Sequence, residues 1–475
     1  MNDPDLPTTP ALGDSTAPRP DVEQLAEQGR AVRAVLPRSA QGEWTPGPSR
    51  RDPVTLLEEQ NEQRLAWLVP VRHLRMRESP FTFFRGSARI MAADLASMPH
   101  TPIEVQLGGD AHLSNFGAHA SPERQLVFDQ NDFDETLPGP FEWDLKRLAT
   151  SVMVAARHLG HSPTEARAAT AASVRAYRQA MKRYSRIGHL DLWYQYVSTG
   201  DVQATNGIDA AELAERVQRF TRRATKRNSL QAVRKLTEGP GTYRIRSDPP
   251  VLFPLRELPD EYDPQVIESV AVAAFEAYKP TLDEARRRLI GRYTLMDIGV
   301  KVVGVGSVGT RAFVLLLRGR DDEDPLFLQA KEATASVFEE FLRPSDYPNH
   351  GQRVVEGQRL VQAQSDIFLG WTAASGTYKR DYYVRQLRDW KGSVETDNAT
   401  PAQLAFYGGL CGLTLARGHA RSGDPEVIHG YVGGGSRLDE AIAEFAHSYA
   451  RQNDEDYERF QQAIRDGRLE VAQSG

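Results

Sequence analysis

The sequence predicts an α+β protein in which a small antiparallel β lobe packs on a larger helical lobe. Runs of β-branched and apolar residues, separated by Gly-rich and acidic turns, are concentrated between residues 291 and 392. On both sides of this block, apolar residues recur at helical spacing. A strand-rich block of this kind between helical regions suggests two lobes of different structure.

Changes in composition and in residue pattern divide the chain into four parts. Residues 1–50 are rich in Pro, Ser, Thr, Ala and Gly, so we expect a disordered or extended segment with one short helix over Val22–Val35. Residues 51–290 form the helical lobe, which carries an acidic loop region. Residues 291–392 form the β lobe, and residues 393–475 supply C-terminal helices that complete the helical lobe.

Periodicity predicts most elements by residue range. The predicted helices are Val54–Leu68, Gly86–Met98, one from Trp143 onward, and about 163–184, 208–236, 263–289, 351–364, 401–419, 437–451 and 454–466. The predicted strands are Ile103–Leu107 and Gln125–Phe128 in the helical lobe, and Asp297–Val305, Thr310–Arg318, Leu326–Lys331, Ile367–Thr372 and Asp381–Leu387 in the β lobe.

Composition excludes several classes of protein. The chain has 475 residues, of which 40% are hydrophobic and 26% charged, and these fractions are ordinary for a globular protein. A net charge of −6 gives no reason to expect nucleic-acid binding. The single cysteine, Cys411, excludes disulfides and a thiolate zinc site. Without a membrane-length apolar stretch or a signal peptide, we expect a cytoplasmic protein that binds no membrane.

The most informative stretch is acidic. GGDAHLSNFG (Gly108–Gly117) places Asn115 five residues after Asp110, and Asp132 follows an intervening strand. Phosphoryl transfer requires a group that positions the attacking hydroxyl and ligands that hold the metal ion. Magnesium in such sites takes one or two carboxylates together with phosphate oxygens and water. These three residues are sufficient for that chemistry.

The same stretch resembles the aminoglycoside phosphotransferase and choline kinase branch of the protein-kinase-like superfamily. That branch has a G-D-x-H-x-x-N loop, a strand ending in a metal-binding aspartate, and a second aspartate on the following helix. The resemblance implies that Asp110 is the catalytic base or substrate orienter and that His112 is the loop histidine. It implies that Asn115 and Asp132 hold magnesium, and that Asp144 braces the loop.

The identity of the metal aspartate stays open. The segment QNDFDE offers Asp129 and Asp134 beside Asp132. Asp132 is preferred because it lies 12 residues before Asp144, as the resemblance requires. Asp129 is the second choice because it follows the strand residues LVF directly.

A glycine-rich stretch forms the second candidate site. Gly304, Gly306 and Gly309 in VVGVGSVGTRAFVLLLRG spell G-x-G-x-x-G, with Ser307 inside the loop. A dinucleotide-binding turn needs a helix directly after the glycines, whereas the residues here continue as a strand. Strand, glycines and strand are typical of the kinase glycine loop that covers the phosphates of ATP. We therefore expect these four residues to contact the nucleotide.

A lysine follows on the next strand. Lys331 lies 22 residues after Gly309 in PLFLQAKEA. In kinase-like proteins this lysine contacts the α- and β-phosphates and pairs with a helix glutamate. We expect Glu356, in the helix of GQRVVEGQRL, to be that partner, with Glu339 as the alternative.

The two candidate stretches occur in an unusual order. The glycine loop and Lys331 follow the Asp110 loop, whereas kinases have the reverse order, so the sequence predicts a circularly permuted kinase-like fold. HARSGD (His419–Asp424) lacks a following asparagine and metal aspartate, and we interpret it as the C-terminal turn of a helix, from which Arg421 could reach a phosphate.

Most of the chain also resembles a bacterial family of undefined role, the domain-of-unknown-function family 2252. The segments that carry this resemblance are SPFTFFRGSARIMAADLA, GGDAHLSNFG, NDFDETLPGPFEWDLKRL, GVGSVGTR, LQAKEA, YVRQLRDWKGS and LARGHARSGD. The family is grouped with kinase-like proteins, and the resemblance names no substrate.

Together these features predict an ATP- and Mg2+-dependent phosphotransferase that acts on an unknown small-molecule or protein acceptor. A nucleotidyl transferase using the same site and a non-catalytic nucleotide-binding pseudokinase are the alternatives. Arg85, Arg385, Trp390 and Lys391 are candidates for the acceptor side, but they are too generic to name a ligand.

Overall fold

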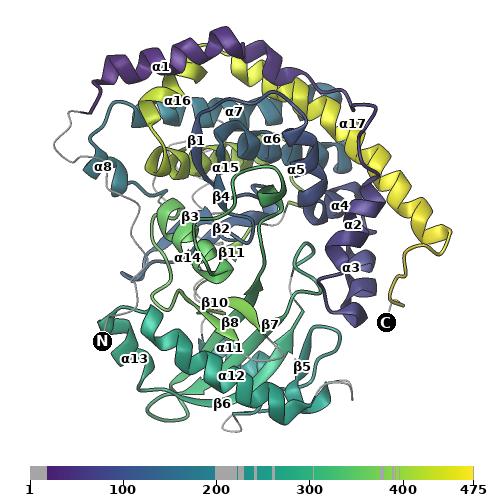
Figure 1. Ribbon diagram of the computed structural model, residues 1–475, viewed down its shortest axis with the longest axis vertical. Helices are drawn as coiled ribbons and strands as arrows, with labels where there is room; N and C mark the ends of the chain where they lie inside the picture. Colours follow the sequence, from purple (N-terminus) through teal and green to yellow (C-terminus); the bar gives the residue numbers. More distant parts are fainter. Residues whose placement is uncertain are drawn as a thin grey trace, which may run out of the picture.

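A computed structural model describes residues 19–197, 222, 229–239, 243–258, 263–302, 304–374, 379–387, 390, 392–394 and 396–473. The first 18 residues, most of the helix expected over 208–236, and Lys391 lie outside the described residues. The described part has mixed α+β structure with antiparallel sheets, as the sequence predicts. In Figure 1 the long helices occupy the upper part of the view, and the largest sheet occupies the lower part.

The described α-helices are α1 (Val22–Val35), α2 (Pro53–Asn61), α3 (Val69–Met76), α4 (Pro80–Gly86), α5 (Ala88–Ala96), α6 (Phe141–His158), α7 (Pro163–Tyr184), α8 (His189–Trp193), α11 (Ser229–Leu236), α12 (Pro264–Tyr278), α13 (Glu284–Ile290), α14 (His350–Val361), α15 (Pro401–Ser422), α16 (Pro425–Val432) and α17 (Arg437–Arg465). The strands are β1 (Glu104–Leu107), β2 (Phe116–Ala120), β3 (Leu126–Gln130), β4 (Leu137–Pro140), β5 (Leu252–Pro254), β6 (Thr294–Lys301), β7 (Ala312–Arg318), β8 (Pro325–Ala333), β9 (Gly370–Ala374), β10 (Arg380–Gln386) and β11 (Gly392–Ser393).

The helical core is built around α6, which is buried along nearly its whole length. Helices α7, α15 and α17 pack against it, and together with α6 they contribute most of the largest hydrophobic cluster. Helices α7 and α15 approach closely because Gly412 has no side chain, and a Cβ there would lie 2.1 Å from the Ser173 carbonyl oxygen. This core fixes the position of α6, which carries several side chains of the candidate site.

The largest sheet has six antiparallel strands in the order β5-β6-β7-β8-β10-β9. Helices α12 and α13 cover one face, where they meet alternate residues such as Leu315 and Leu328. Helix α11 lies against the other face, near Val314 and Phe327. Helix α14 lies between this sheet and the helical core, because it packs on β8, β9 and β10 as well as on α15.

Two smaller sheets lie next to the candidate site. Strands β1 and β4 pair with each other, and β2 pairs with both β3 and β11. Sequence patterning did not predict β2, β4, β5 or β11, since each has five residues or fewer and little β-type periodicity. These short strands hold the ends of the acidic loops.

Several predicted boundaries were wrong for local reasons. The helix expected over Val54–Leu68 ends at Asn61, and α3 begins with Pro70 in its first turn. The segment SPFTFFRG forms a helix of its own, α4, because Ser79 and Thr82 make a capping box at its start. The two helices expected near the C-terminus form one, α17, which continues through Asn453.

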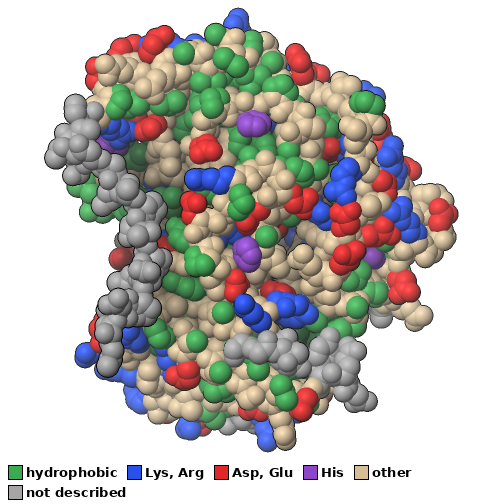
Figure 2. Space-filling view, in the orientation of Figure 1, with side chains coloured by type: hydrophobic (Ala, Val, Ile, Leu, Met, Phe, Trp, Pro, Cys, Tyr) green, Lys and Arg blue, Asp and Glu red, His purple; other side chains and the backbone are tan. Residues whose placement is uncertain are grey.

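The surface carries both signs of charge. Figure 2 shows acidic and basic side chains intermixed over one face of the molecule. The structure contains many ion pairs between exposed side chains, such as Arg468 with Glu58 and Arg167 with Glu444. None of the described helices is long and apolar enough to cross a membrane.

Candidate functional site

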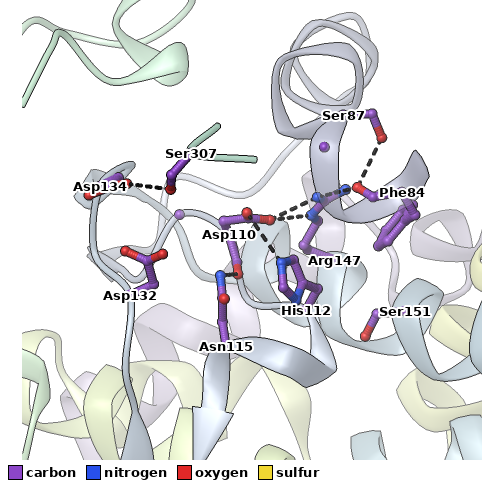
Figure 3. A network of polar contacts seen from close by, with 12 residues as sticks. Phe84, Ser87, Asp110, His112, Asn115, Asp132, Asp134, Arg147, Ser151 and Ser307 are labelled. Carbon is purple, nitrogen blue, oxygen red and sulfur yellow. Dashed lines mark hydrogen bonds and ion pairs between the residues drawn. The ribbon is translucent and has the colours of Figure 1, made fainter. Parts of the chain in front are cut away.

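Three loops that are far apart in the sequence meet at one cavity of about 630 Å³. The first carries Asp110 after β1, the second carries Asp132 and Asp134 after β3, and the third is the glycine loop between β6 and β7. Figure 3 shows Asp110, Asp132 and Asp134 around a common space, with Ser307 of the glycine loop beside Asp134. The structure therefore brings together the two stretches that sequence analysis singled out.

The Asp110 loop is held by α6. The Asp144 carboxylate accepts hydrogen bonds from the backbone N–H groups of Gly108 at 2.7 Å and Gly109 at 3.0 Å. Gly109 has a φ of +87°, and a Cβ there would lie 2.2 Å from the Glu135 carbonyl oxygen. Asp144 thus braces the loop, as the sequence predicts, and the second acidic loop lies directly against the first.

Asp110 is oriented by an arginine from α6. Arg147 Nε donates to Asp110 Oδ1 at 2.9 Å, and another guanidinium nitrogen donates to the Phe84 carbonyl oxygen at 2.8 Å. Burial raises the pKa of Asp110, and the charges of Arg147 and Arg85 oppose that rise. The carboxylate keeps partial exposure, 18%, toward the cavity. It is both fixed in direction and accessible to a ligand.

His112 and Asn115 lie beside Asp110. His112 Nε2 is 3.5 Å from Asp110 Oδ2. Burial, together with the charges of Arg85 and Arg147, lowers the pKa of His112 well below its usual value, so the ring is neutral at pH 7. Asn115 donates from its side-chain amide to the Asp110 carbonyl oxygen at 2.8 Å. Both residues line the cavity, and the amide oxygen of Asn115 is the atom that can serve as a metal ligand.

Asp132 and Asp134 meet the lysine of β8. Lys331 Nζ lies 3.3 Å from Asp132 Oδ1 and also contacts Asp134 Oδ2. The Tyr383 hydroxyl donates to Asp134 at 2.9 Å, and the Ser307 hydroxyl donates to it at 3.2 Å. Asp134 therefore joins the glycine loop, the lysine strand and the acidic loop at one carboxylate.

The charges of this group are strongly coupled. Burial raises the pKa of Asp132, and the neighbouring Asp134 raises it further. Burial also acts to raise the pKa of Asp134, but Lys331 and Tyr383 outweigh it and lower that pKa overall. The two carboxylates raise the pKa of Lys331 against the effect of burial, so the lysine stays charged. Arg385 also lies close enough to lower the pKa of both carboxylates, so two basic and two acidic side chains meet at this point.

Asp129 has a different environment. Its carboxylate is fully buried, 2.6 Å from Arg417, and it also accepts from the Ala363 N–H at 2.9 Å. Asp129 is not among the described residues that line the cavity. Asp129 is on β3, and its carboxylate faces Arg417 of α15 inside the protein, so its oxygens accept hydrogen bonds from protein donors. This differs from the interpretation of Asp129 as a candidate metal ligand.

The glycine loop is held by the N-terminal helices. The Leu65 N–H donates to the Gly309 carbonyl oxygen at 2.8 Å, and Arg75 donates to the Gly304 carbonyl oxygen at 2.6 Å. Gly304 and Gly309 have φ values of +67° and +91°, which favour glycine. Arg64 donates to the Val308 carbonyl oxygen. Sequence analysis missed this role of the α2–α3 region because no local pattern relates it to a loop about 240 residues away.

Neither candidate glutamate contacts Lys331 among the described residues. Glu356 pairs with Arg359 at 3.2 Å on the same helix, and Glu339 caps Ser336 at 2.9 Å. Arg353 of α14 instead reaches the acidic loop, where it donates to the carbonyl oxygens of Asp134 and Thr136. Lys331 is paired instead with Asp132 and Asp134.

The residues predicted as candidates for contacts with the acceptor or with phosphate do not all lie at the cavity. Arg85 lines the cavity, whereas Arg385 donates to the Asn131 carbonyl oxygen at 2.7 Å. Trp390 lies 4.4 Å from the guanidinium of Arg124. Arg421 is still within α15, where it stacks on Trp193 at 3.9 Å, so this part of the HARSGD segment is helical and does not line the cavity.

The cavity contains an acid that sequence analysis missed. Glu135 lines it, and its side chain accepts from the Val337 N–H at 2.8 Å. Burial raises the pKa of Glu135 to about 7. No group of three or more His, Cys, Asp or Glu side chains in the described part of the chain is arranged to hold a metal ion. A magnesium site would therefore need phosphate oxygens or water beside the protein's carboxylates.

Comparison with known proteins gives a family and no named function. No curated protein and no solved structure matches the chain at a significant level. A family model described as "Uncharacterized protein conserved in bacteria (DUF2252)" matches residues 64–463, a span that includes all three loops of the cavity. The chain belongs to this bacterial family, DUF2252.

Proposed function

We propose that this protein is an ATP- and Mg2+-dependent phosphotransferase with a circularly permuted, kinase-like arrangement of two lobes. The observation that carries the proposal is the contact of Lys331 with both Asp132 and Asp134 at a cavity shared by Asp110 and the glycine loop. A lysine paired with aspartates of a cavity that a glycine loop also lines is the combination that a kinase uses to hold Mg-ATP.

The arrangement of the sheet supports this proposal. The glycines lie between the antiparallel strands β6 and β7, and the lysine lies on the third strand, β8. Helix α14 then follows, before β9 and β10. Protein kinases likewise place the glycine loop over the phosphates and the lysine on the third strand, with a helix after it. In this chain the acidic loops come before the sheet, which is the reason for proposing a permutation.

Each residue of the cavity would have a distinct role in binding or catalysis. Asp132 and Asp134 would hold the magnesium ion with the Asn115 amide oxygen, and Lys331 would contact the phosphates. Asp110 would orient the acceptor hydroxyl and accept its proton, which the burial-raised pKa of this carboxylate favours. Arg147 fixes the direction of Asp110, and Arg85 would add positive charge at the same end of the cavity.

The first test is binding. Thermal unfolding should shift upward with ATP and magnesium together, and not with NAD or NADP. A ligand present at 100 times its dissociation constant stabilises a protein by about 2.7 kcal/mol. Lys331→Met should abolish the shift in unfolding temperature. Lys279→Met is the control and should keep the shift, because Lys279 pairs with the exposed Glu276 away from the cavity. Equal shifts for Lys331→Met and wild type would refute the proposed nucleotide site.

A second candidate function uses the same site. Nucleotidyl transfer is compatible with these residues, and the absence of a Lys331–glutamate pair among the described residues is a specific departure from the kinase pattern. Protein incubated with γ-labelled and α-labelled ATP and a panel of acceptors separates the two reactions. Label transferred from the γ position supports the kinase reaction, and label transferred from the α position supports nucleotidyl transfer. Mg-ATP binding with neither label transferred would support a non-catalytic nucleotide-binding protein.

A further inference from the structure

A second cavity lies on the opposite side of the lysine strand. It has a volume of about 290 Å³, is partly open to solvent, and lies between α12 and the face of the largest sheet that points away from Lys331. Its lining is mostly apolar, with Ile267 and Phe275 from α12 and Phe313 and Val384 from the sheet. Known ligand sites start at about 300 Å³, so this cavity can accept a small apolar molecule.

Small residues contribute to the lining of the cavity. Ala271 and Ala274 of α12 and Ala330 of β8 all line it, and larger side chains at these positions would reduce the space. Empty apolar cavities destabilise a fold because their lining loses packing contacts. Because most of its lining is apolar, the cavity is better suited to an apolar ligand than to water.

The polar end of the cavity is positively charged. Arg311 and Arg380 are the charged residues among those that line it. Both pair with the buried Glu332, Arg311 at 3.1 Å and Arg380 at 3.2 Å. Within the described part of the chain, one carboxylate faces these two guanidinium groups, which leaves an excess of one positive charge there. Arg311 and Arg380 are 25% and 48% exposed, which places this charge at the solvent end of the cavity.

We propose that this cavity binds a medium-chain fatty acid, with the alkyl chain between α12 and the sheet and the carboxylate at Arg311 and Arg380. The apolar lining accommodates the alkyl chain, and the positive charge favours a single anionic head group over a neutral or cationic one. The site does not depend on the proposed phosphotransferase activity. It lies directly behind the proposed nucleotide site, because Ala330 and Glu332 flank Lys331 on β8 and Arg311 closely follows the glycine loop.

The test is calorimetric titration of the full-length protein with monomeric decanoate, octanoate and decanol. Decanoate should bind, and octanoate should bind about tenfold more weakly because it buries two fewer methylene groups. Ala271→Phe should weaken decanoate binding at least tenfold by filling the cavity. Ala273→Phe is the matched control, because Ala273 is on the exposed side of the same helix and its variant should bind as wild type does.

A second variant tests the head group without filling the cavity. Arg380→Gln should weaken decanoate binding and leave decanol binding unchanged. The proposal is overturned if decanoate does not bind the wild-type protein, or if Ala271→Phe folds and binds decanoate normally. Equal binding of decanoate and decanol, unaffected by Arg380→Gln, would overturn the choice of a carboxylate. Co-sedimentation with phosphatidylglycerol vesicles without binding of free decanoate would also overturn it, since it would indicate a lipid surface instead.

Discussion

Replacement of Asp129 by asparagine distinguishes a structural carboxylate from a metal ligand. In the structure this side chain is 0% exposed, and it forms the ion pair with Arg417 at 2.6 Å. Arg417 is also 0% exposed. Its Nε and one terminal nitrogen have no other hydrogen-bond partner among the described residues. The carboxylate of Asp129 is therefore the main compensation for a fully buried charge.

The size of the effect follows from this geometry. Asparagine can still accept one of the bonds made by Arg417 and Ala363, but its amide nitrogen then faces a second donor. Removing one partner of a buried ion pair costs about 3–5 kcal/mol, because the other charge remains without compensation. A loss of this size is a large part of the roughly 5–15 kcal/mol that stabilises a typical domain. We expect Asp129→Asn to lower the unfolding free energy by about 3–5 kcal/mol.

Urea unfolding followed by circular dichroism measures this free energy, with the slope of the transition used to check that the unfolded state is unchanged. The double variant Asp129→Leu with Arg417→Met should recover most of the loss, since replacing both members of a buried pair by apolar residues is often neutral. Asp132→Asn is the matched control, because it removes a carboxylate that lines the cavity. It should cost little stability and abolish the response to Mg-ATP. The reasoning is refuted if Asp129→Asn unfolds like wild type and loses the response to Mg-ATP.

Three further predictions concern the same cavity. The pKa of Glu135 in the folded protein, about 7, lies above its value of 4.5 in an unfolded chain, so the protein loses stability as the pH rises from about 4.5 to 7. The Glu135→Gln variant has no charge to bury. In urea unfolding, its unfolding free energy should therefore rise by about 2–3 kcal/mol relative to that of wild type between pH 5 and pH 8. Gly309→Ala should cost about 1–2 kcal/mol because φ is +91°, and should weaken nucleotide binding. Gly160→Ala is the control, because Gly160 has a φ of +74° and open space around it. It should lose a similar amount of stability and bind nucleotide as wild type does. Asp144→Ala leaves two loop N–H groups without an acceptor and should cost about 2–4 kcal/mol by thermal unfolding.

The pH dependence of the Glu135→Gln variant is the clearest test of whether burial raises the pKa of Glu135. If the glutamine variant tracks wild type across this pH range, Glu135 is solvated and does not titrate near neutrality. For Asp144→Ala, normal stability would show that the Asp110 loop holds its shape without α6.

Local sequence was sufficient for the parts of the site that are defined by spacing along the chain. Asp110 and Asn115 belong to one short loop, and Lys331 follows the glycines on an adjacent strand, so neighbouring residues carry the pattern. The brace from Asp144 was expected only from the resemblance to the aminoglycoside phosphotransferase and choline kinase branch, and the structure shows the carboxylate bonded to the backbone of the Asp110 loop. The α+β class and the antiparallel pairing of β6, β7 and β8 followed from periodicity and turns.

Tertiary structure alone decided which carboxylate faces the cavity. Asp129, Asp132 and Asp134 are close in sequence and chemically alike, yet α15 supplies Arg417 to the first and β8 supplies Lys331 to the other two. Burial and charge at a side chain depend on elements packed against it from distant parts of the chain, and a local pattern contains no information on them. The same reason explains why the contact of Arg64 with the glycine loop could not be predicted.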